Sequence, residues 1–454
     1  MGSGAALHNF LTHGRARRRD VLSLIGMGIG MRIGMSLAAS ALRAASEKFE
    51  TLADWMRASR AARKDALASC LDRIQRMDPS IHAWVQVLPQ PQVGDGPLAG
   101  IPFGVKDIIE TRNLVTEYGS PIYQGRHGSA DAAIVRRLQS LGAIMVGKTQ
   151  AAAFAYRTPP PTRNPRNLEH TPGGSSSGSA AAVAAGMVPI AIGTQTIGSV
   201  LRPASYCGVT GFKASFGLLP MDGVLPFAHS LDTLGFFTPA PSDMLLLWEA
   251  LGQPIGRKED VALGKVSLGV VEPLPEVEPP MAAAFRETIV RLRSRGISVK
   301  PVPIAPLLIQ LAEAATVVEF YEGARFHQQR FKQYGDRLLD LADLVRSGLQ
   351  IPDQRYREAL SFISESKKRM AERYETTPVI LAPAATGPAP RGLASTGDGR
   401  MNSPWTALGT PAISVPMGVS QGLPVGIQLT AAHGQDARVL QMAAQLAPII
   451  SSLA

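Results

Sequence analysis

The chain has 454 residues, of which 45% are hydrophobic and 18% are charged, and this composition excludes an intrinsically disordered protein and allows a large core. The net charge of +10 is unevenly placed, since residues 1–50 hold seven basic and three acidic side chains. No dense basic stripe interleaved with aromatics follows, so we expect no nucleic-acid partner. Only two cysteines occur and the eight histidines lack metal-binding spacing, so we expect no metal and no other cofactor.

The N-terminal segment differs from the rest of the chain. Three arginines at 17–19 precede an apolar run at 21–31, and small residues at 39–41 could form a cleavage site. The pattern is similar to a twin-arginine export signal, which would place the protein in the periplasm or outside the cell after transient membrane contact through this leader. The run is too short to span a bilayer. Two alternatives are a basic amphipathic helix on a membrane surface and a cytoplasmic protein that starts at Met27 or Met35.

Helical and strand patterns alternate after the leader, as is typical of a layered α/β core. A helical pattern over 52–76 comes first. A short buried strand is expected over 103–108, then a helix over 132–141 that ends at a glycine, and a strand over 143–146.

Two segments carry candidate chemistry. In Gly104-Val105-Lys106-Asp107 a lysine follows an apolar run, and such a lysine could act as a base if burial keeps it neutral, although alone it more often reaches the surface. In residues 171–199 two serine-bearing, glycine-lined turns, 173–179 and 195–199, bracket a segment of small residues. Such turns let a backbone approach a ligand and present hydroxyl nucleophiles. A glycine/serine run alone is more often a linker, but a linker is not normally followed by a small, apolar segment suited to helix packing.

Taken together, these motifs resemble the amidase signature family of serine amide hydrolases. In that family the nucleophile follows the first serine of the glycine/serine block by 24 residues, which is the separation between Ser175 and Ser199. The segment around Lys106 and the residues at 202–204 and 206–213 also match the family pattern. The likeness runs from the first expected helix to the C-terminus.

The resemblance implies one α/β/α sandwich around a large, mixed, twisted sheet over residues 46–454, after a leader of residues 1–45. It implies hydrolysis of a small-molecule, non-peptide carboxylic amide through an acyl-enzyme, with release of ammonia or an amine. Ser199 would be the nucleophile, Ser175, preceded by a cis peptide bond, the bridge, and Lys106 the base. The oxyanion hole is expected from the backbone N–H groups of Thr196, Ile197, Gly198 and Ser199.

The turn before Ser199 departs from the family pattern. Most relatives have Asp-[Ser/Thr]-Gly-Gly where this chain has Gln195-Thr196-Ile197-Gly198. A glutamine can still orient backbone through hydrogen bonds. The β-branched Ile197, however, restricts the backbone and would either narrow the acyl pocket or impair the oxyanion hole. Substrate contacts are expected from Gly173, Gly174, Tyr321 and Trp405, and a place for Trp405 in the core is an equally good interpretation.

The second half of the chain is mainly helical before it returns to strands. The residues between about 300 and 375 depart most from the family and are expected to line the pocket. The expected elements are helices over 281–295 and 307–373, strands over 379–382, 412–415 and 422–429, and a closing helix over 437–447.

Two other functions are consistent with the same fold. The A subunits of tRNA-dependent amidotransferases use this triad to release ammonia from glutamine for a partner subunit. Their Asp-Thr-Gly-Gly segment is absent here, and an export signal is incompatible with a role in translation. A catalytically impaired binding protein would keep the fold without a reactive serine, against which the joint presence of Lys106, Ser175 and Ser199 argues. Oligomeric state is open, with a homodimer as the commonest arrangement of symmetric enzymes.

Overall fold

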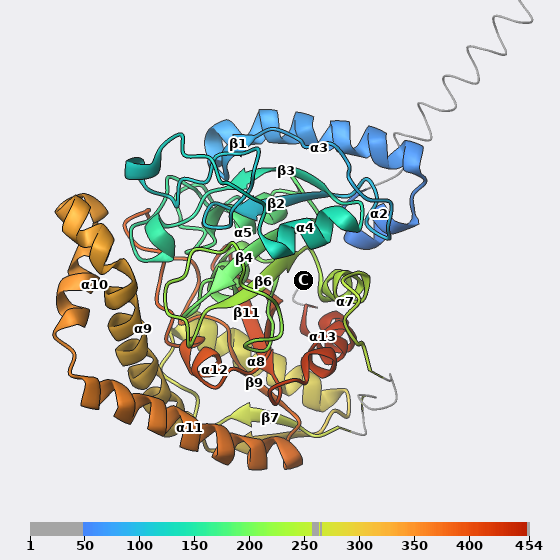
Figure 1. The fold of residues 1–454 in the computed structure, drawn as a ribbon. Coiled ribbons are helices and arrows are strands. Elements are labelled where there is room, and N and C mark those ends of the chain that lie inside the picture. Colours follow the sequence, from blue (N-terminus) through green and yellow to red (C-terminus); the bar gives the residue numbers. More distant parts are fainter. Residues whose placement is uncertain (1–48, 257–262, 264–265, 452–454) are drawn as a thin grey trace, which may run out of the picture. The chain divides into compact units, whose positions relative to one another are not determined.

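A computed structural model describes residues 49–256, 263 and 266–451. These residues belong to one compact unit that begins at Phe49 (Figure 1). The leader expected over residues 1–45, with its export signal, lies outside the described residues. None of the helices in the described part is both long and apolar enough to cross a membrane.

An eleven-stranded mixed sheet runs through the unit (Figure 1), with the order β1-β3-β2-β4-β6-β5-β10-β11-β9-β7-β8. The trios β3-β2-β4 and β9-β7-β8 are parallel, and the other neighbouring strands are antiparallel. The mixed sheet expected from the family resemblance is therefore confirmed. The strands are β1 (Trp84–Val87), β2 (Pro102–Lys106), β3 (Ile144–Thr149), β4 (Ile190–Gln195), β5 (Thr210–Lys213), β6 (Thr233–Thr238), β7 (Leu268–Val271), β8 (Val299–Val302), β9 (Val379–Pro383), β10 (Ala412–Ser420) and β11 (Leu423–Thr430).

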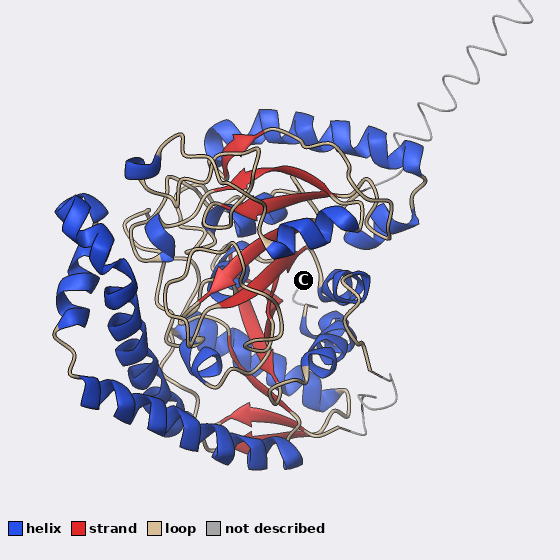
Figure 2. Ribbon diagram, viewed as in Figure 1, coloured by secondary structure: helices blue, strands red, loops and turns tan. Residues whose placement is uncertain are grey.

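Helices cover both faces of the sheet (Figure 2). Helices α5 and α6 pack against each other, whereas α13 packs against both α7 and α8. The long helices α9, α10 and α11 pack together outside these layers (Figure 1). The helices are α2 (Leu52–Arg57), α3 (Arg60–Ile81), α4 (Ala133–Ser140), α5 (Ser177–Ala184), α6 (Leu201–Cys207), α7 (Pro241–Ala250), α8 (Pro279–Ser294), α9 (Ala305–Tyr334), α10 (Asp340–Leu349), α11 (Asp353–Thr376), α12 (Ser403–Ala407) and α13 (Asp436–Ile450).

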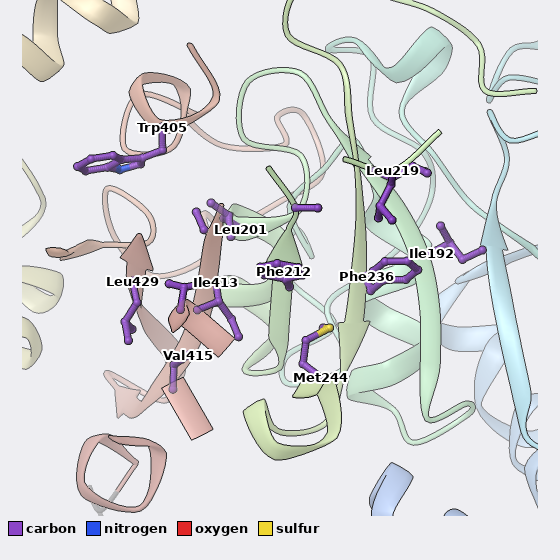
Figure 3. Close-up of a cluster of buried hydrophobic side chains, with 14 of the residues drawn as sticks. Ile192, Leu201, Phe212, Leu219, Phe236, Met244, Trp405, Ile413, Val415 and Leu429 are labelled. Atoms are coloured by element: carbon purple, nitrogen blue, oxygen red, sulfur yellow. The ribbon is translucent and has the colours of Figure 1, made fainter. Parts of the chain in front are cut away.

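Strand alternation explains how one sheet supports two cores. In β4, Ala191 belongs to the smaller cluster, which includes residues of α5 and α6, whereas Ile192 belongs to the larger cluster that includes Met244 of α7. The cross-strand partners Ile192, Phe236 and Phe212 continue this larger cluster across three strands (Figure 3). Successive side chains of a strand point to opposite faces, so each face of the sheet buries its own set.

The predicted elements are present, with several changes of boundary. The helix predicted over 52–76 is two helices, because Ala58 is extended and the Ser59 hydroxyl accepts a hydrogen bond from Ala62 N (3.2 Å) to begin α3. The helical region predicted over 307–373 is three helices, separated by a 3-10 turn that begins at Gly335 and by Pro352. Six strands were not predicted. Four of them, β1, β5, β7 and β8, have only four residues each. The six-residue strands β4 and β6 were also missed.

The parallel pairing of β2 with β4 determines where chemistry can occur. Both strands end at the same edge of the sheet, so Lys106 at the end of β2 lies beside the last residues of β4. The chain segments that contain Ser175 and Ser199 also lie at this edge, directly before α5 and after β4. In open α/β sheets, ligands bind in the crevice outside the carboxyl ends of the strands.

Candidate active site

Lys106 is fully buried and makes two hydrogen bonds to hydroxyl groups. Its Nζ donates to Ser175 Oγ at 2.8 Å and to Thr194 Oγ1 of β4 at 2.9 Å. Burial removes the hydration of the ammonium and lowers the pKa of Lys106 to about 7, and the nearby carboxylate of Asp232 opposes part of this shift. Both partners are hydroxyls, which can donate to a neutral amine as well as accept from an ammonium. The geometry therefore allows Lys106 to accept a proton near neutral pH.

Ser175 lies immediately before α5, and its peptide bond to Gly174 is cis, as the resemblance implied. The carbonyl oxygen of Gly174 accepts a hydrogen bond from Arg202 Nη2 at 2.7 Å. Arg202 is in the first turn of α6 and is itself buried, with Nε donating to the backbone oxygen of Thr396 at 2.8 Å. Because Arg202 follows Ser199 by three residues, this hydrogen bond ties the turn that contains Ser199 to the peptide unit that precedes Ser175.

Gln195 organises the turn that carries Ser199. Its side-chain oxygen accepts from the backbone N–H groups of Val200 (2.9 Å) and Leu201 (3.1 Å), and its amide nitrogen donates to Thr406 Oγ1 (3.0 Å). The glutamine thus orients the backbone through hydrogen bonds, as the sequence suggested it could. No hydrogen bond from the backbone N–H of Ile197, Gly198 or Ser199 to another described residue is formed, and all three residues line the cleft described below.

Ile197 is accommodated where the family pattern has glycine. Neither Ile197 nor Gly198 has a positive φ, so this turn does not need the left-handed region that disfavours a β-branched residue. A Cβ on Gly399 would lie 2.7 Å from Ile197 Cγ2, which shows that the isoleucine side chain occupies space left by that glycine. At position 198 a Cβ would lie 2.7 Å from Asn402 Oδ1, so glycine is needed there for space.

Two residues that the sequence analysis missed complete the site. Thr194 accepts the second hydrogen bond of the Lys106 amine, beside the one that Ser175 accepts. Asp232 accepts hydrogen bonds from Thr196 Oγ1 at 2.6 Å and from the backbone N–H of Phe227 at 2.7 Å. Burial raises the pKa of Asp232 to about 6, and these hydrogen bonds oppose the rise. A signal was present in both cases, because each is a polar residue at one end of an apolar strand segment. The sequence alone did not show that β4 and β6 pair side by side.

A cleft of about 1580 Å³ opens beside Ser199. One face of α9 forms part of its wall, with Leu308, Ala312, Thr316 and Glu319 recurring at helical spacing. This agrees with the expectation that the helical region lines the pocket. The lining has more acidic than basic side chains, and these are Glu276, Glu278, Glu313, Glu319, Asp340, Asp343 and Asp398 against Arg157, Arg202 and Arg400.

None of the four residues predicted to contact substrate is among the residues that line this cleft. Gly173 and Gly174 pack so closely that a Cβ would lie 2.9 Å from Pro203 Cα and 2.6 Å from Thr396 Cγ2, respectively. Tyr321 donates its hydroxyl to Asp353 (2.6 Å) and stacks on Tyr356 with ring centroids 3.9 Å apart. Trp405 is fully buried in α12, in agreement with its alternative interpretation as a core residue (Figure 3).

The described residues contain no group of three or more histidine, cysteine, aspartate or glutamate side chains that could hold a metal ion. The groups that the fold brings together beside the cleft are the hydroxyls of serine and threonine, the amine of Lys106 and the carboxylate of Asp232.

A family model described as Amidase matches residues 65–440. The chain belongs to the amidase signature family. Among its relatives is the A subunit of the glutamyl-tRNA(Gln) amidotransferase of Symbiobacterium thermophilum, with 32% identity over 448 residues that cover 83% of this chain and 91% of the relative. Proteins with the same name in Thermus thermophilus and Thermotoga maritima are each 30% identical to this chain.

Solved structures of family members resemble this fold over most of its length. One, described as an amidase, has a TM-score of 0.77 and 26% identity, and the match covers 85% of this chain and 95% of that one. Another is the peptide amidase PAM in complex with the competitive inhibitor chymostatin, with a TM-score of 0.72, 27% identity and coverage of 85% and 93%. Hydrolysis of an amide C–N bond is thus the general activity with which the family and the site agree.

Proposed function

We propose that this protein hydrolyses a carboxylic amide through an acyl-enzyme on Ser199. The observation that carries the proposal is the buried hydrogen bond between Lys106 Nζ and Ser175 Oγ (2.8 Å), at the sheet edge where the turn that contains Ser199 opens onto a large cleft. A buried lysine with a pKa near 7 is neutral often enough to act as a base at physiological pH.

The reaction follows from these groups. Ser199 Oγ attacks the amide carbon, its proton passes to Ser175, and the proton of Ser175 passes to Lys106. When the tetrahedral intermediate collapses, the C–N bond breaks and the same relay, run in reverse, returns a proton to the leaving nitrogen. Water then attacks the acyl-enzyme, gives its proton to the relay, and releases the carboxylic acid with Ser199 restored.

The negative charge that develops on the amide oxygen needs hydrogen-bond donors. The backbone N–H groups of Ile197, Gly198 and Ser199 are the candidates, because they line the cleft and are not used by the described part of the fold. Two hydrogen bonds fix this turn. Gln195 accepts from the backbone N–H of Val200, and Asp232 accepts from the hydroxyl of Thr196. Donors held in place before the reaction stabilise the oxyanion without reorganisation, an effect of about 3 kcal/mol per donor in related chemistry.

Covalent labelling with a fluorophosphonate tests this proposal. We expect strong labelling of the wild type, no labelling of Ser199→Ala and weak labelling of Ser175→Ala and Lys106→Ala. Ser347→Ala is the matched control, because Ser347 is an exposed serine of the same cleft, on α10, and should label like the wild type. Absence of labelling in a folded wild type between about pH 7 and pH 9.5 would instead support the binding protein that keeps the fold without a reactive serine.

A second candidate is glutamine hydrolysis as the A subunit of a tRNA-dependent amidotransferase. The relatives named above support it, since this chain covers 91% of the Symbiobacterium protein at 32% identity. Ammonia release from glutamine should then far exceed release from simple alkyl amides, and a partner complex should increase the rate. Efficient hydrolysis of alkyl amides by the isolated chain, with glutamine untouched, would favour a free-standing amidase.

The two candidates also differ in where the protein would act. An exported enzyme should be isolated from its cell with an N-terminus near residue 42, after cleavage at the small residues that end the leader. A protein that works in translation should keep an N-terminus at or near one of the upstream methionines. Mass spectrometry of the N-terminal peptide of the native protein separates these outcomes.

A further inference from the structure

The charge of the cleft is opposite to that of the chain. The chain as a whole has a formal net charge of +10, yet the cleft is lined by seven carboxylates and three arginines. A cleft lined by one sign of charge raises the local concentration of ligands of the opposite sign. Because the nucleophilic serine lies in this same cleft, the ligand that meets the charge is the substrate itself.

The arginines cancel only part of this charge, because Arg400 also lies 3.5 Å from Glu276. Arg202 is engaged by the backbone oxygens of Thr396 and Gly174, and Arg400 pairs with Asp398 at 2.6 Å. Arg157 is exposed, and its guanidinium lies over the ring of Tyr156, 5.2 Å from the centroid. Among the described residues, none of the three forms an ion pair with a carboxylate on the wall formed by α9.

Glu319 differs from the other carboxylates of the cleft. Asp343 pairs with Arg346 (2.8 Å), and Asp340 accepts from the hydroxyl of Thr158 (2.9 Å). Within the described part of the chain, the side chain of Glu319 forms neither an ion pair nor a hydrogen bond, and unlike Glu313 on the same helix face it is partly buried. Burial raises the pKa of Glu319 to about 7, with Arg157 opposing the rise. A desolvated carboxylate without a donor costs free energy that a cationic ligand can recover.

Glu319 is also close to the reacting groups. Its charge interacts with those of Asp232, beneath the Ser199 turn, and Arg202, one turn after Ser199. Glu319 and Ser199 line the same cleft. A substrate whose carbonyl reaches Ser199 can extend a short chain to Glu319.

We propose that the cleft selects amides that carry an ammonium group, and that Glu319 binds this group. The proposal rests on the proposed amide hydrolysis and names its substrate class. The ammonium supplies hydrogen-bond donors and a directly paired positive charge, neither of which Glu319 has among the described residues. Glutamine belongs to this class, as do ω-aminoalkanamides.

The experiment compares pairs of amides that differ only in a terminal ammonium or methyl group, over a series of chain lengths, with the ω-carboxy analogue as the anionic member. We expect kcat/KM to favour the ammonium member by about ten- to hundredfold at one chain length, mainly through KM. In Glu319→Gln this ratio should fall towards one, and Glu319→Asp should restore part of it. Glu313→Gln, on the same helix face but at the exposed rim, should change the ratio by less than about twofold.

Binding of the same pairs to Ser199→Ala, measured by calorimetry, separates this proposal from the proposed reaction. If the wild type cleaves no amide but Ser199→Ala binds the ammonium member more tightly in a Glu319-dependent way, the substrate-class inference stands and the reaction is wrong. Equal affinity and equal kcat/KM within each pair would overturn the inference. So would a Glu319→Gln protein that keeps the wild-type preference.

Discussion

The two walls of the cleft are built on different principles. On the sheet side, Lys106 donates hydrogen bonds to Ser175 and Thr194, all three are buried, and Lys106 and Thr194 lie at the ends of neighbouring parallel strands. On the helix side, α9 and α10 present charged side chains with few partners and more solvent. A reaction that needs a lysine with a low pKa requires that lysine to be buried. Recognition of a substrate instead requires polar side chains that can still form hydrogen bonds or ion pairs with the ligand. The difference teaches that reaction and specificity can be altered separately.

The largest effect is expected on the sheet wall, from Ser199→Ala. Removal of the nucleophile should lower kcat by about 10⁴- to 10⁶-fold, as for other serine hydrolases. Thermal unfolding should change little, because the side chain of Ser199 makes no hydrogen bond to another described residue and opens onto the cleft. Steady-state rates with an amide substrate and a melting curve check both statements. If the variant kept even a hundredth of the wild-type rate, Ser199 would not be the nucleophile.

A pair of buried lysines sharpens the comparison within the sheet wall. Lys148 on β3 is as buried as Lys106 and also donates to a hydroxyl, Thr116 Oγ1 (2.7 Å). Its Nζ, however, donates in addition to the backbone oxygen of Ile109 (2.5 Å) and lies 4.0 Å from a carboxylate oxygen of Asp107. A carbonyl and a carboxylate stabilise the ammonium, whereas the two hydroxyls beside Lys106 can serve either form. We infer that Lys148 holds the fold and Lys106 moves protons.

The test substitutes methionine, which keeps most of the length of the side chain, at each position. Lys106→Met should lower kcat/KM by about 10²- to 10⁴-fold with a small change in stability. Lys148→Met should leave buried acceptors unpaired, lower the free energy of unfolding by about 1–3 kcal/mol, and keep labelling of Ser199 in the folded fraction. Denaturant melts and fluorophosphonate labelling of both variants measure this. Loss of labelling in a folded Lys148→Met protein would remove the distinction between the two lysines.

The pH dependence of kcat/KM should follow the titration of the base, Lys106. Lys106 accepts a proton only when neutral, and burial lowers its pKa to about 7. Below this value the neutral fraction falls about tenfold per pH unit, so log kcat/KM should rise with a slope near one from about pH 5.5 and level off above about pH 7.5. Measurement of kcat/KM from about pH 5.5 to pH 9.5 in a buffer of constant ionic strength tests it. A profile that is flat below about pH 7 would mean that Lys106 is not the base in the free enzyme.

The same contrast explains what could be predicted from sequence. The spacing between Ser175 and Ser199 and the segment around Lys106 are local patterns, and they were sufficient to predict the α/β sandwich and the three residues that the fold gathers at one sheet edge. Asp232 was missed because only the pairing of β4 with β6 brings it under Thr196. The local sequence pattern does not indicate which strands pair.

For the side of the cleft formed by α9 and α10, the sequence predicted the region that lines the pocket but not the individual residues. The sequence indicated that the divergent helices line the pocket, but Tyr321 was the residue chosen, and it faces Tyr356 and Asp353. The neighbouring Glu319 lines the cleft instead, because two positions along a helix differ by about 200° around its axis. A helix that contacts α10, α11 and α12 buries more than one of its faces, so amphipathic periodicity could not identify the face that meets the cleft.

The smallest effect is expected at the contact between Ile197 and Gly399. Gly399 does not have a positive φ, so alanine is compatible with its backbone, but the added Cβ would lie 2.7 Å from Ile197 Cγ2 and 2.8 Å from Arg202 Nη1. Gly399→Ala should therefore displace these side chains and lower kcat/KM by about three- to tenfold. Ile197→Ala removes Cγ2 and should restore much of the loss in the double variant, because it reopens the space.

A double-mutant cycle on kcat/KM measures this coupling between Ile197 and Gly399. The control is the single variant Ile197→Ala. A second glycine such as Gly392 cannot serve, because its φ of 84° would make alanine strained for a different reason. Additive effects would mean that Arg202, rather than Ile197, senses the added methyl group. A positive coupling would show that isoleucine at 197 is tolerated because glycine at 399 leaves room for it. The departure from the family pattern would then depend on two residues in contact, Ile197 and Gly399, and would reshape the acyl pocket without disturbing the backbone donors of the turn.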